Sequence, residues 1–205
     1  MARVVFLCGG IASGKSTVSR ELAARGARCV DLDVLSREST RAGSVVNERL
    51  AQAFGRDVVD DKTGELRRDV LARRAFASPE RTRELEAITH PAIRELLEQW
   101  LLSHADAAVC VVEVPLPDRV EDLLSLADEV LCVTCPVELR RVRAIARGMS
   151  AEDFDARVAR QPSDDYLASI ATTVIDNSSS NEHLHARIDE WWQTRAGSSL
   201  SHAAE

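Results

Sequence analysis

The chain alternates short apolar runs with stretches of helical periodicity. Continuous apolar runs rich in β-branched residues are typical of strands buried in a parallel sheet. Runs of this kind, or shorter apolar segments, are found at residues 4–8, 28–30, 107–114, 130–133 and 173–176. Strands that alternate with helices predict an α/β fold built around a parallel sheet.

The longest interval between two predicted strands, residues 36–104, has a mostly helical pattern. A polar cluster at 60–64 predicts a solvated turn, and Pro79 predicts the start of a helix. His90-Pro91 interrupts the helical pattern, so we expect a kink or two helices there. A helical insertion of this length suits a substrate-binding subdomain.

Further helices are predicted toward the C-terminus. One starts at Pro136 and runs towards Ile145, and a second runs from capping residues at 150–153 to Gln161. The last has an apolar side that includes Ile188, Trp191 and Trp192, which we interpret as core packing. Residues 196–205 are small and polar, and we expect them to form a flexible tail.

Composition narrows the class of protein. The chain has 205 residues, a net charge of −7, 45% hydrophobic residues and 29% charged residues, as in an ordinary globule of one α/β domain. The negative charge argues against a broad surface for nucleic acid or anionic membranes. No run reaches the length of a membrane span and no signal peptide is apparent, so we expect a cytoplasmic protein.

Cysteine usage supports the same compartment. The chain has five cysteines in or beside strand-like runs: Cys8, Cys29, Cys110, Cys132 and Cys135. An odd number buried in strands indicates reduced core residues. Cys132 and Cys135 have C-x-x-C spacing, but no second pair or nearby histidine completes a zinc site, so we interpret them as strand residues.

The strongest chemical signal is the segment from Gly9 to Thr17, Gly-Gly-Ile-Ala-Ser-Gly-Lys-Ser-Thr. It matches the pattern G-x-x-x-x-G-K-[ST] and lies between a predicted strand and a predicted helix, the context that a phosphate-binding loop requires. Backbone N–H groups would surround phosphate oxygens, Lys15 would reach the β- and γ-phosphates, and Ser16 would ligate Mg²⁺. The alternative is a plain glycine turn with a solvated Lys15, and the full motif in this context favours the phosphate site.

Two carboxylates, Asp31 and Asp33, end the second predicted strand. Open α/β sheets bind ligands at the carboxyl ends of their strands, so we expect both residues beside the phosphate loop. Alternation along a strand would point them to the same side, where one could orient a nucleophilic hydroxyl and the other could hold a metal through water. Alternatively, Asp33 caps a helix that starts at Val34. The residues alone leave both interpretations open.

Arginines crowd the segment after Pro136. A charge run is usually a solvated face, but arginines over a polyphosphate are also what a lid needs. Arg143 and Arg147 are one helical turn apart and could face a nucleotide together. The members of the cluster are Arg140, Arg141, Arg143 and Arg147.

In their order and spacing, these motifs resemble those of the dephospho-CoA kinases, and the resemblance runs from the first strand to Asn177. It rests on the phosphate loop and on elements that follow in family order: Asp31-x-Asp33 with Arg37, Phe54-Gly55, Gly64-x-Leu66-x-Arg68-x-x-Leu71, Phe76, His90-Pro91, Pro115-Leu116, Gln161 and Val174-Ile175-Asp176-Asn177. The resemblance implies a three-layer, adenylate-kinase-like P-loop kinase fold with a parallel central sheet, a helical substrate-binding insertion and a lid. We therefore expect a nucleotide-binding core at 1–35, 106–140 and 170–195, a CoA-binding insertion at 36–105, a lid at 141–169 and a tail at 196–205.

The resemblance also implies a reaction, in which the γ-phosphate of ATP passes to the 3′-hydroxyl of dephospho-CoA with Mg²⁺. The implied nucleotide-binding residues are Gly10, Ile11, Ala12, Ser13, Gly14, Lys15, Ser16, Thr17, Arg143 and Asn177. The implied substrate-binding residues are Asp33, Arg37, Arg68, His90, Pro115 and Leu116. Lys15, Asp33 and Arg147 are the implied catalytic residues, and Ser16 is the implied metal ligand.

Three segments depart from the family pattern. Where the family has Pro-Leu-Leu followed by glutamate, this chain has Pro-Leu-Pro-Asp-Arg at 115–119, which bears on the acceptor pocket. Arg143 and Arg147 match the paired lid arginines only with small compensating gaps, since an ungapped alignment puts Val142 and Ala146 there. The family's Ala-Asp before the last strand is Ala-Thr at 171–172.

The first hypothesis is a small-molecule kinase that acts on dephospho-CoA, without a nucleic-acid or membrane partner, as a monomer or small homo-oligomer. Another nucleoside or nucleotide kinase is the nearest alternative, and a shikimate-type acceptor is more distant. From a different class, the chain could be a non-catalytic nucleotide-binding relative or switch. The altered segment 117–119 is the feature that keeps this last alternative open.

Overall fold

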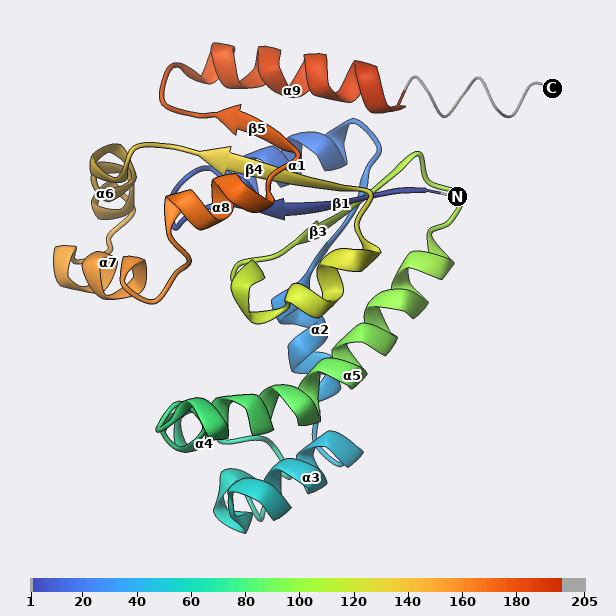
Figure 1. Cartoon of the computed structure of the whole chain (residues 1–205), viewed down its shortest axis with the longest axis vertical. Helices are drawn as coiled ribbons and strands as arrows, with labels where there is room; N and C mark the ends of the chain where they lie inside the picture. Colours follow the sequence, from blue (N-terminus) through green and yellow to red (C-terminus); the bar gives the residue numbers. More distant parts are fainter. Residues whose placement is uncertain (1, 197–205) are drawn as a thin grey trace. The chain divides into compact units, whose positions relative to one another are not determined.

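The computed structural model describes residues 2–196, which form two compact units (Figure 1). Unit 1 contains the residues up to Asp31 and those from Ser103 onward, and unit 2 is Leu32–Leu102. The helical insertion therefore begins four residues earlier than the expected residue 36. Of the expected tail, residues 197–205 lie outside the described residues, and Ala196 ends the last helix.

Unit 1 is built on a parallel sheet, as the apolar runs predict. Its strands are β1 (Arg3–Cys8), β2 (Arg28–Asp31), β3 (Val109–Glu113), β4 (Glu129–Thr134) and β5 (Thr173–Asp176). They lie in the order β2-β3-β1-β4-β5, and every pair is parallel. Because β1 lies at the centre, the loop that follows it opens at the middle of the sheet's carboxyl edge.

Both faces of the sheet are covered, which explains why the strand sequences are continuously apolar. Alternate residues such as Val5 and Leu7 on β1 belong to one core with residues from α1 (Lys15–Ala24) and α9 (Asn181–Ala196). The intervening Phe6 and Cys8 are also fully buried. Strand β1 is thus fully buried from Val5 to Cys8 and partly exposed only at Arg3 and Val4.

The remaining helices of unit 1 follow β4. They are α6 (Val137–Ala146), α7 (Ala151–Val158) and α8 (Asp164–Ile170). The predicted capping at 150–153 is confirmed, because the Ser150 hydroxyl accepts a hydrogen bond from the Asp153 N–H. The sequence interpretation missed α8 and the two 3₁₀ segments η2 (Pro117–Arg119) and η3 (Glu121–Leu126). Seven residues in α8, or three and six in the 3₁₀ segments, are too few for periodicity to be seen.

Unit 2 is helical, as the pattern at 36–104 predicts. Its elements are α2 (Leu32–Ser39), α3 (Val45–Phe54), the 3₁₀ turn η1 (Arg56–Val58), α4 (Arg68–Ala75) and most of α5 (Pro79–Ser103). Its core contains Leu50, Phe54, Leu71 and Ile88. The alternative of two helices at His90-Pro91 is wrong, since α5 runs as one helix through Pro91. Figure 1 shows that the axis of α5 bends along its length, as the expected kink requires.

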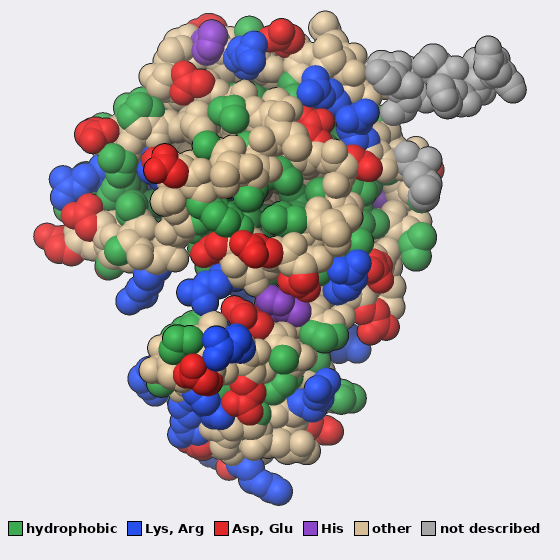
Figure 2. Space-filling model, viewed as in Figure 1, with side chains coloured by type: hydrophobic (Ala, Val, Ile, Leu, Met, Phe, Trp, Pro, Cys, Tyr) green, Lys and Arg blue, Asp and Glu red, His purple; other side chains and the backbone are tan. Residues whose placement is uncertain are grey.

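On the visible face of the molecule, charged side chains of both signs are mixed rather than separated (Figure 2). Figure 2 shows acidic and basic side chains interspersed on the visible face of each unit. Among the described residues, no helix is long and apolar enough to cross a membrane.

A buried carboxylate, Glu129, fixes the edge of the sheet opposite the phosphate loop. Its side chain is 5% exposed and accepts hydrogen bonds from Thr173 Oγ1 (2.6 Å) and Trp191 Nε1 (2.8 Å). Arg195 and Arg3 pair with it at 3.2 and 3.5 Å. Burial alone raises the pKa of Glu129, but the hydrogen bonds from Thr173, Trp191 and Arg195 outweigh it and lower the pKa below the ordinary 4.5.

We expect Glu129→Gln to lower the free energy of unfolding by about 2 kcal/mol at pH 7, because it removes the charge that two arginines face. The folded-state pKa is depressed, so this contribution is complete above pH 4.5 and is lost as the pH falls through the folded-state value. Urea denaturation at pH 7 and pH 3 should therefore show a difference from wild type that shrinks in acid. The matched control is Glu190→Gln, an exposed glutamate on α9, with a change within about 0.5 kcal/mol.

Candidate active site

The residues of the predicted phosphate loop line one cavity in unit 1. The loop leaves β1 at Cys8, and α1 begins at Lys15, so the first N–H groups of the helix point back toward the loop. The cavity has a volume of about 270 Å³. It is lined by Gly10, Ala12, Ser13, Gly14, Lys15, Ser16, Thr17, Arg20 and Arg147. Of the loop residues predicted to bind nucleotide, only Ile11 is not in this lining.

Lys15 is one of three cationic residues that line this cavity, with Arg20 and Arg147. Its Nζ donates a hydrogen bond to the Gly9 carbonyl at 2.9 Å, which holds the side chain folded over the loop. Burial lowers the pKa of Lys15, and the nearby charge of Glu113 opposes that shift, with smaller opposing contributions that include Asp31. Because the ammonium group is half-buried, water solvates it incompletely. A nearby phosphate would therefore stabilise its positive charge.

Two carboxylates flank Lys15 at the same edge of the sheet. Asp31 ends β2 and Glu113 ends β3, and the two residues are register partners. Sequence reasoning placed Asp31 at this edge but missed Glu113. The signal for it was present, since Glu113 is the only acidic residue within the apolar run 107–114.

The arginines near the loop differ in their contacts: some line the cavity and others bond elsewhere. Arg147, at the C-terminal end of α6, lines the cavity. Arg143 instead donates from Nη1 to Cys135 Sγ at 3.3 Å and is not in the lining, so its predicted contact with nucleotide stays a prediction. Arg20 also lines the cavity, with Nε donating to the Ser16 carbonyl at 3.0 Å. Sequence reasoning missed Arg20, although it follows Ser16 by one helical turn.

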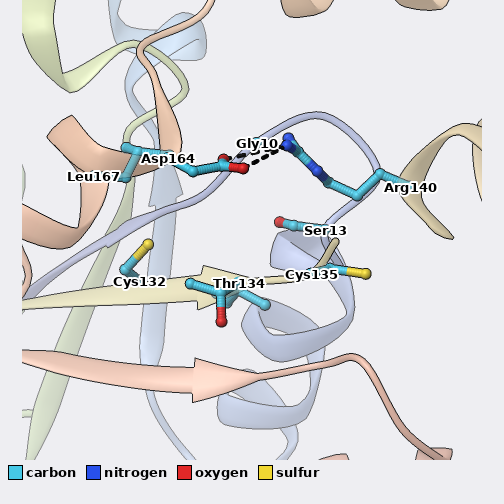
Figure 3. Close-up of a pocket in the computed structure, with 9 residues that line it drawn as sticks. Gly10, Ser13, Cys132, Thr134, Cys135, Arg140, Asp164 and Leu167 are labelled. Carbon is cyan, nitrogen blue, oxygen red and sulfur yellow. Dashed lines mark hydrogen bonds and ion pairs between the residues drawn. The ribbon is translucent and has the colours of Figure 1, made fainter. Parts of the chain in front are cut away.

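A second arginine, Arg140, supports the loop from outside the cavity. Its side chain is 5% exposed, and Nη2 bonds both carboxylate oxygens of Asp164 at 3.0 and 3.1 Å. Figure 3 shows the guanidinium group lying beside Gly10, with Asp164 pointing toward it from α8. A Cβ atom at Gly10 would overlap Arg140 Nη1, so a side chain at this position would displace the guanidinium group.

Asn177 supports the loop from the end of β5. It is 6% exposed, and its Nδ2 donates to the Ser13 carbonyl at 2.7 Å. A Cβ atom at Gly14 would overlap the same amide nitrogen, and Gly14 has a φ of 111°. Asn177 therefore contacts the loop itself, and its predicted contact with nucleotide stays a prediction.

The structure changes the interpretation of Asp33. Helix α2 begins at Leu32, so Asp33 lies inside its first turn rather than at the end of β2. The alternative that Asp33 caps a helix starting at Val34 is therefore wrong, and strand alternation does not relate Asp33 to Asp31. The carboxylate is exposed near the positive end of the α2 dipole, where a negative charge is stabilised.

The other predicted acceptor residues are divided between the units. In unit 2, Arg68 Nη2 donates to Thr40 Oγ1 at 2.9 Å, and the same hydroxyl donates to the Arg37 carbonyl at 3.2 Å. Thr40 thus links the side chain of Arg68 to the backbone of Arg37. His90 lies on α5. In unit 1, Pro115 and Leu116 follow β3 directly and lead into η2.

The site has a donor set suited to a nucleotide phosphate and to Mg²⁺. Magnesium is commonly held by one or two carboxylates together with substrate phosphates, rather than by an all-protein cage. The exposed Ser16 hydroxyl and the carboxylates of Asp31 and Glu113 provide ligands of that kind. Consistent with this, residues 2–196 contain no cluster of three or more His, Cys, Asp or Glu side chains that could hold a metal alone.

Comparison with known proteins gives a consistent result. The family model described as dephospho-CoA kinase matches residues 3–183. A dephospho-CoA kinase from Corynebacterium diphtheriae is 42% identical over 193 residues, covering 93% of this chain and 96% of its own length. One from Corynebacterium jeikeium is 40% identical over 190 residues, with coverage of 92% and 97%.

Solved structures agree on the fold. A crystal structure of a protein from Thermus thermophilus has a TM-score of 0.74 and 33% identity, covering all of this chain and 98% of that chain. The dephospho-CoA kinase from Campylobacter jejuni has a TM-score of 0.69 at 23% identity, covering 97% and 100%. A shikimate kinase from Acinetobacter baumannii shares the fold at a TM-score of 0.52 and 15% identity, with coverage of 100% and 97%.

Proposed function

Because the chain belongs to the dephospho-CoA kinase family, we propose that it transfers the γ-phosphate of ATP to the 3′-hydroxyl of dephospho-CoA. The observation that carries the proposal is the cavity lined by the phosphate loop, with Lys15 and Arg147 in its lining. Such a transfer breaks the bond from the γ-phosphorus to the bridging oxygen of ADP and forms a bond to the acceptor oxygen. The loose transition state needs positioning and charge neutralisation more than covalent help from the protein.

Each group at the loop has a defined part in this proposal. The loop N–H groups and Lys15 hold the β- and γ-phosphates, and Arg147 neutralises charge on the phosphoryl group in transit. Mg²⁺ would be held by Ser16, with Asp31 and Glu113 reaching it through water, and would neutralise charge between the β- and γ-phosphates. Arg20, one helical turn after Ser16, adds a positive charge to the lining of the same cavity.

The acceptor is assigned to unit 2 and to the residues after β3. Asp33 is assigned as the general base that orients the 3′-hydroxyl and takes its proton. Arg37 and Arg68, which Thr40 links through the Arg37 backbone and the Arg68 side chain, are assigned the positive charge that the phosphates of dephospho-CoA require. His90, Pro115 and Leu116 are assigned to the remainder of the acceptor.

The test is ADP release from ATP and Mg²⁺ with dephospho-CoA, compared with a panel of nucleosides, nucleotides and shikimate. Selective turnover with dephospho-CoA, with product phosphorylated at the 3′ position, is the expected result. Faster turnover with another acceptor would replace the proposed substrate. ATP binding without turnover on any acceptor would identify a nucleotide-binding protein that is not a kinase.

We expect Arg147→Ala to lower kcat by about 10²-fold, because it removes a positive charge from the wall of the phosphate cavity. The matched control is Arg141→Ala on the same helix. Arg141 pairs with Asp155 at 3.1 Å on an exposed surface, so its loss should change kcat less than about twofold. Steady-state kinetics at saturating ATP and acceptor compare the two variants. Equal, small effects would show that Arg147, like Arg141, acts only as a surface charge.

A further inference from the structure

A strained residue lies at the centre of the phosphate loop. Among the described residues, Ala12 is the only non-glycine residue with a positive φ, at 58°. A left-handed backbone is unfavourable for alanine, and such residues persist only where the surrounding structure holds them. Ala12 lies within a turn of the loop that is closed by a hydrogen bond from the Ser13 N–H to the Gly10 carbonyl at 3.1 Å.

Side-chain amides hold two peptides that bracket Ala12, Gly10–Ile11 before it and Ser13–Gly14 after it. On one side, Gln161 Oε1 accepts a hydrogen bond from the Ile11 N–H at 2.7 Å. On the other side, Asn177 Nδ2 donates to the Ser13 carbonyl at 2.7 Å. One contact takes a backbone donor and the other takes a backbone acceptor, so together they fix the orientation of both peptides.

These amides are themselves held in place by the fold. Asn177 is buried, and its own N–H donates to the Thr134 carbonyl at the end of β4 at 2.9 Å. Gln161 lies between α7 and α8, and Asp164 at the start of α8 bonds Arg140 beside Gly10. The loop is therefore fastened to β5 on one side and to the 141–169 segment on the other.

We infer that Gln161 and Asn177 are positioning residues, which hold the strained Ala12 so that the loop has its phosphate-receiving shape before nucleotide arrives. Neither side chain is among the residues that line the 270 Å³ cavity. Their effect on nucleotide is transmitted through the Ile11 and Ser13 peptides. The inference rests on the proposed function only in that the loop receives a nucleotide phosphate.

Loss of these amide contacts should weaken nucleotide binding rather than slow the chemical step. If the contact with Gln161 is removed, the loop populates its binding shape for only a fraction of the time, and apparent affinity falls by that fraction. We expect Gln161→Ala to weaken ADP binding by about 10-fold and to raise the KM for ATP similarly, with kcat at saturating ATP lowered less than about threefold. Gln161 is only half-buried, so the variant should fold.

A second substitution tests the part played by Ala12. Glycine adopts a positive φ without the alanine penalty, so Ala12→Gly should restore about fivefold of the lost ADP affinity in the Gln161→Ala background. In the wild-type background, where the contacts already hold the loop, the same change should raise ADP affinity by a smaller factor than it does in the Gln161→Ala background. This non-additivity would show that Gln161 and Ala12 are energetically coupled. A general loss of stability in the variants would not produce it.

The experiment is isothermal titration of the full-length protein with ADP and Mg²⁺, for wild type, Gln161→Ala, Ala12→Gly and the double variant. Gln193→Ala, which removes an exposed amide on α9, is the control and should bind ADP as wild type does. Asn177→Asp, which has no amide donor for the Ser13 carbonyl, should weaken ADP binding as Gln161→Ala does. If that buried variant does not fold, the Gln161 series still decides the inference.

Several results would overturn the inference. Unchanged ADP affinity in Gln161→Ala would show that the contact does not shape the loop. Tighter binding would show that Gln161 competes with phosphate for the Ile11 N–H. Equal gains from Ala12→Gly in both backgrounds would show that the strain is unrelated to the amide contacts. ADP titration needs no acceptor, so failure of the proposed reaction with dephospho-CoA would leave this test intact.

Discussion

Lys15→Ala is expected to lower kcat by about 10³-fold or more, while the protein stays folded. The ammonium group lines the phosphate cavity, and removing it leaves the charge that develops on the phosphates opposed only by backbone N–H groups and by Arg20 and Arg147. Stability should change little, because two effects oppose each other. The variant avoids the cost of burying a charged amine, and it also loses the attraction between Lys15 and Glu113.

The chain offers a matched control for this experiment. Its sequence contains only two lysines, and the other, Lys62, is an exposed residue of the turn at 60–63. Lys62→Ala should have wild-type kcat and ADP affinity. Steady-state kinetics and circular dichroism of both variants complete the test. Near-normal turnover of folded Lys15→Ala would remove the phosphate-loop assignment altogether.

Asp33→Asn is expected to lower kcat by about 10²-fold or more, within the range for loss of a general base. The substitution keeps the shape of the side chain but removes the carboxylate that would take the proton of the acceptor hydroxyl. ADP affinity should stay within about twofold of wild type, because the phosphates are held by the loop in unit 1. Stability should fall by less than about 1 kcal/mol, the range for one carboxylate near a helix N-terminus.

The control for Asp33 is another acidic residue of the same helix. Glu38→Gln removes an exposed carboxylate that pairs with Arg41 at 2.7 Å, near the other end of α2. Its kcat and thermal midpoint should both resemble wild type. If Asp33→Asn and Glu38→Gln have equal, small effects on kcat, then Asp33 is a surface residue of α2 and the acceptor base lies elsewhere.

The sequence by itself determined the sheet, the helical insertion and the phosphate loop. Strands such as β1 and β3 are buried on both faces, so their sequences are continuously apolar and can be recognised without structure. The loop motif is equally local, because glycines, Lys15 and Ser16 act within one strand–loop–helix unit. The family resemblance depended on the same kind of short, ordered motif, and the comparisons confirm it.

Only the tertiary structure decided which distant side chains serve the loop. Gln161 and Asn177 are about 150 and 164 residues away from the peptides they hold, and nothing in a local pattern marks their contacts. The same is true of Glu113, which meets Asp31 only because β2 and β3 pair in one register. The sequence alone also could not separate Arg147 in the cavity wall from Arg143 at Cys135, since helical spacing gives both the same pattern. Local patterns fix local structure, whereas the partners of a polar group depend on how the chain packs, and packing is a property of the whole fold.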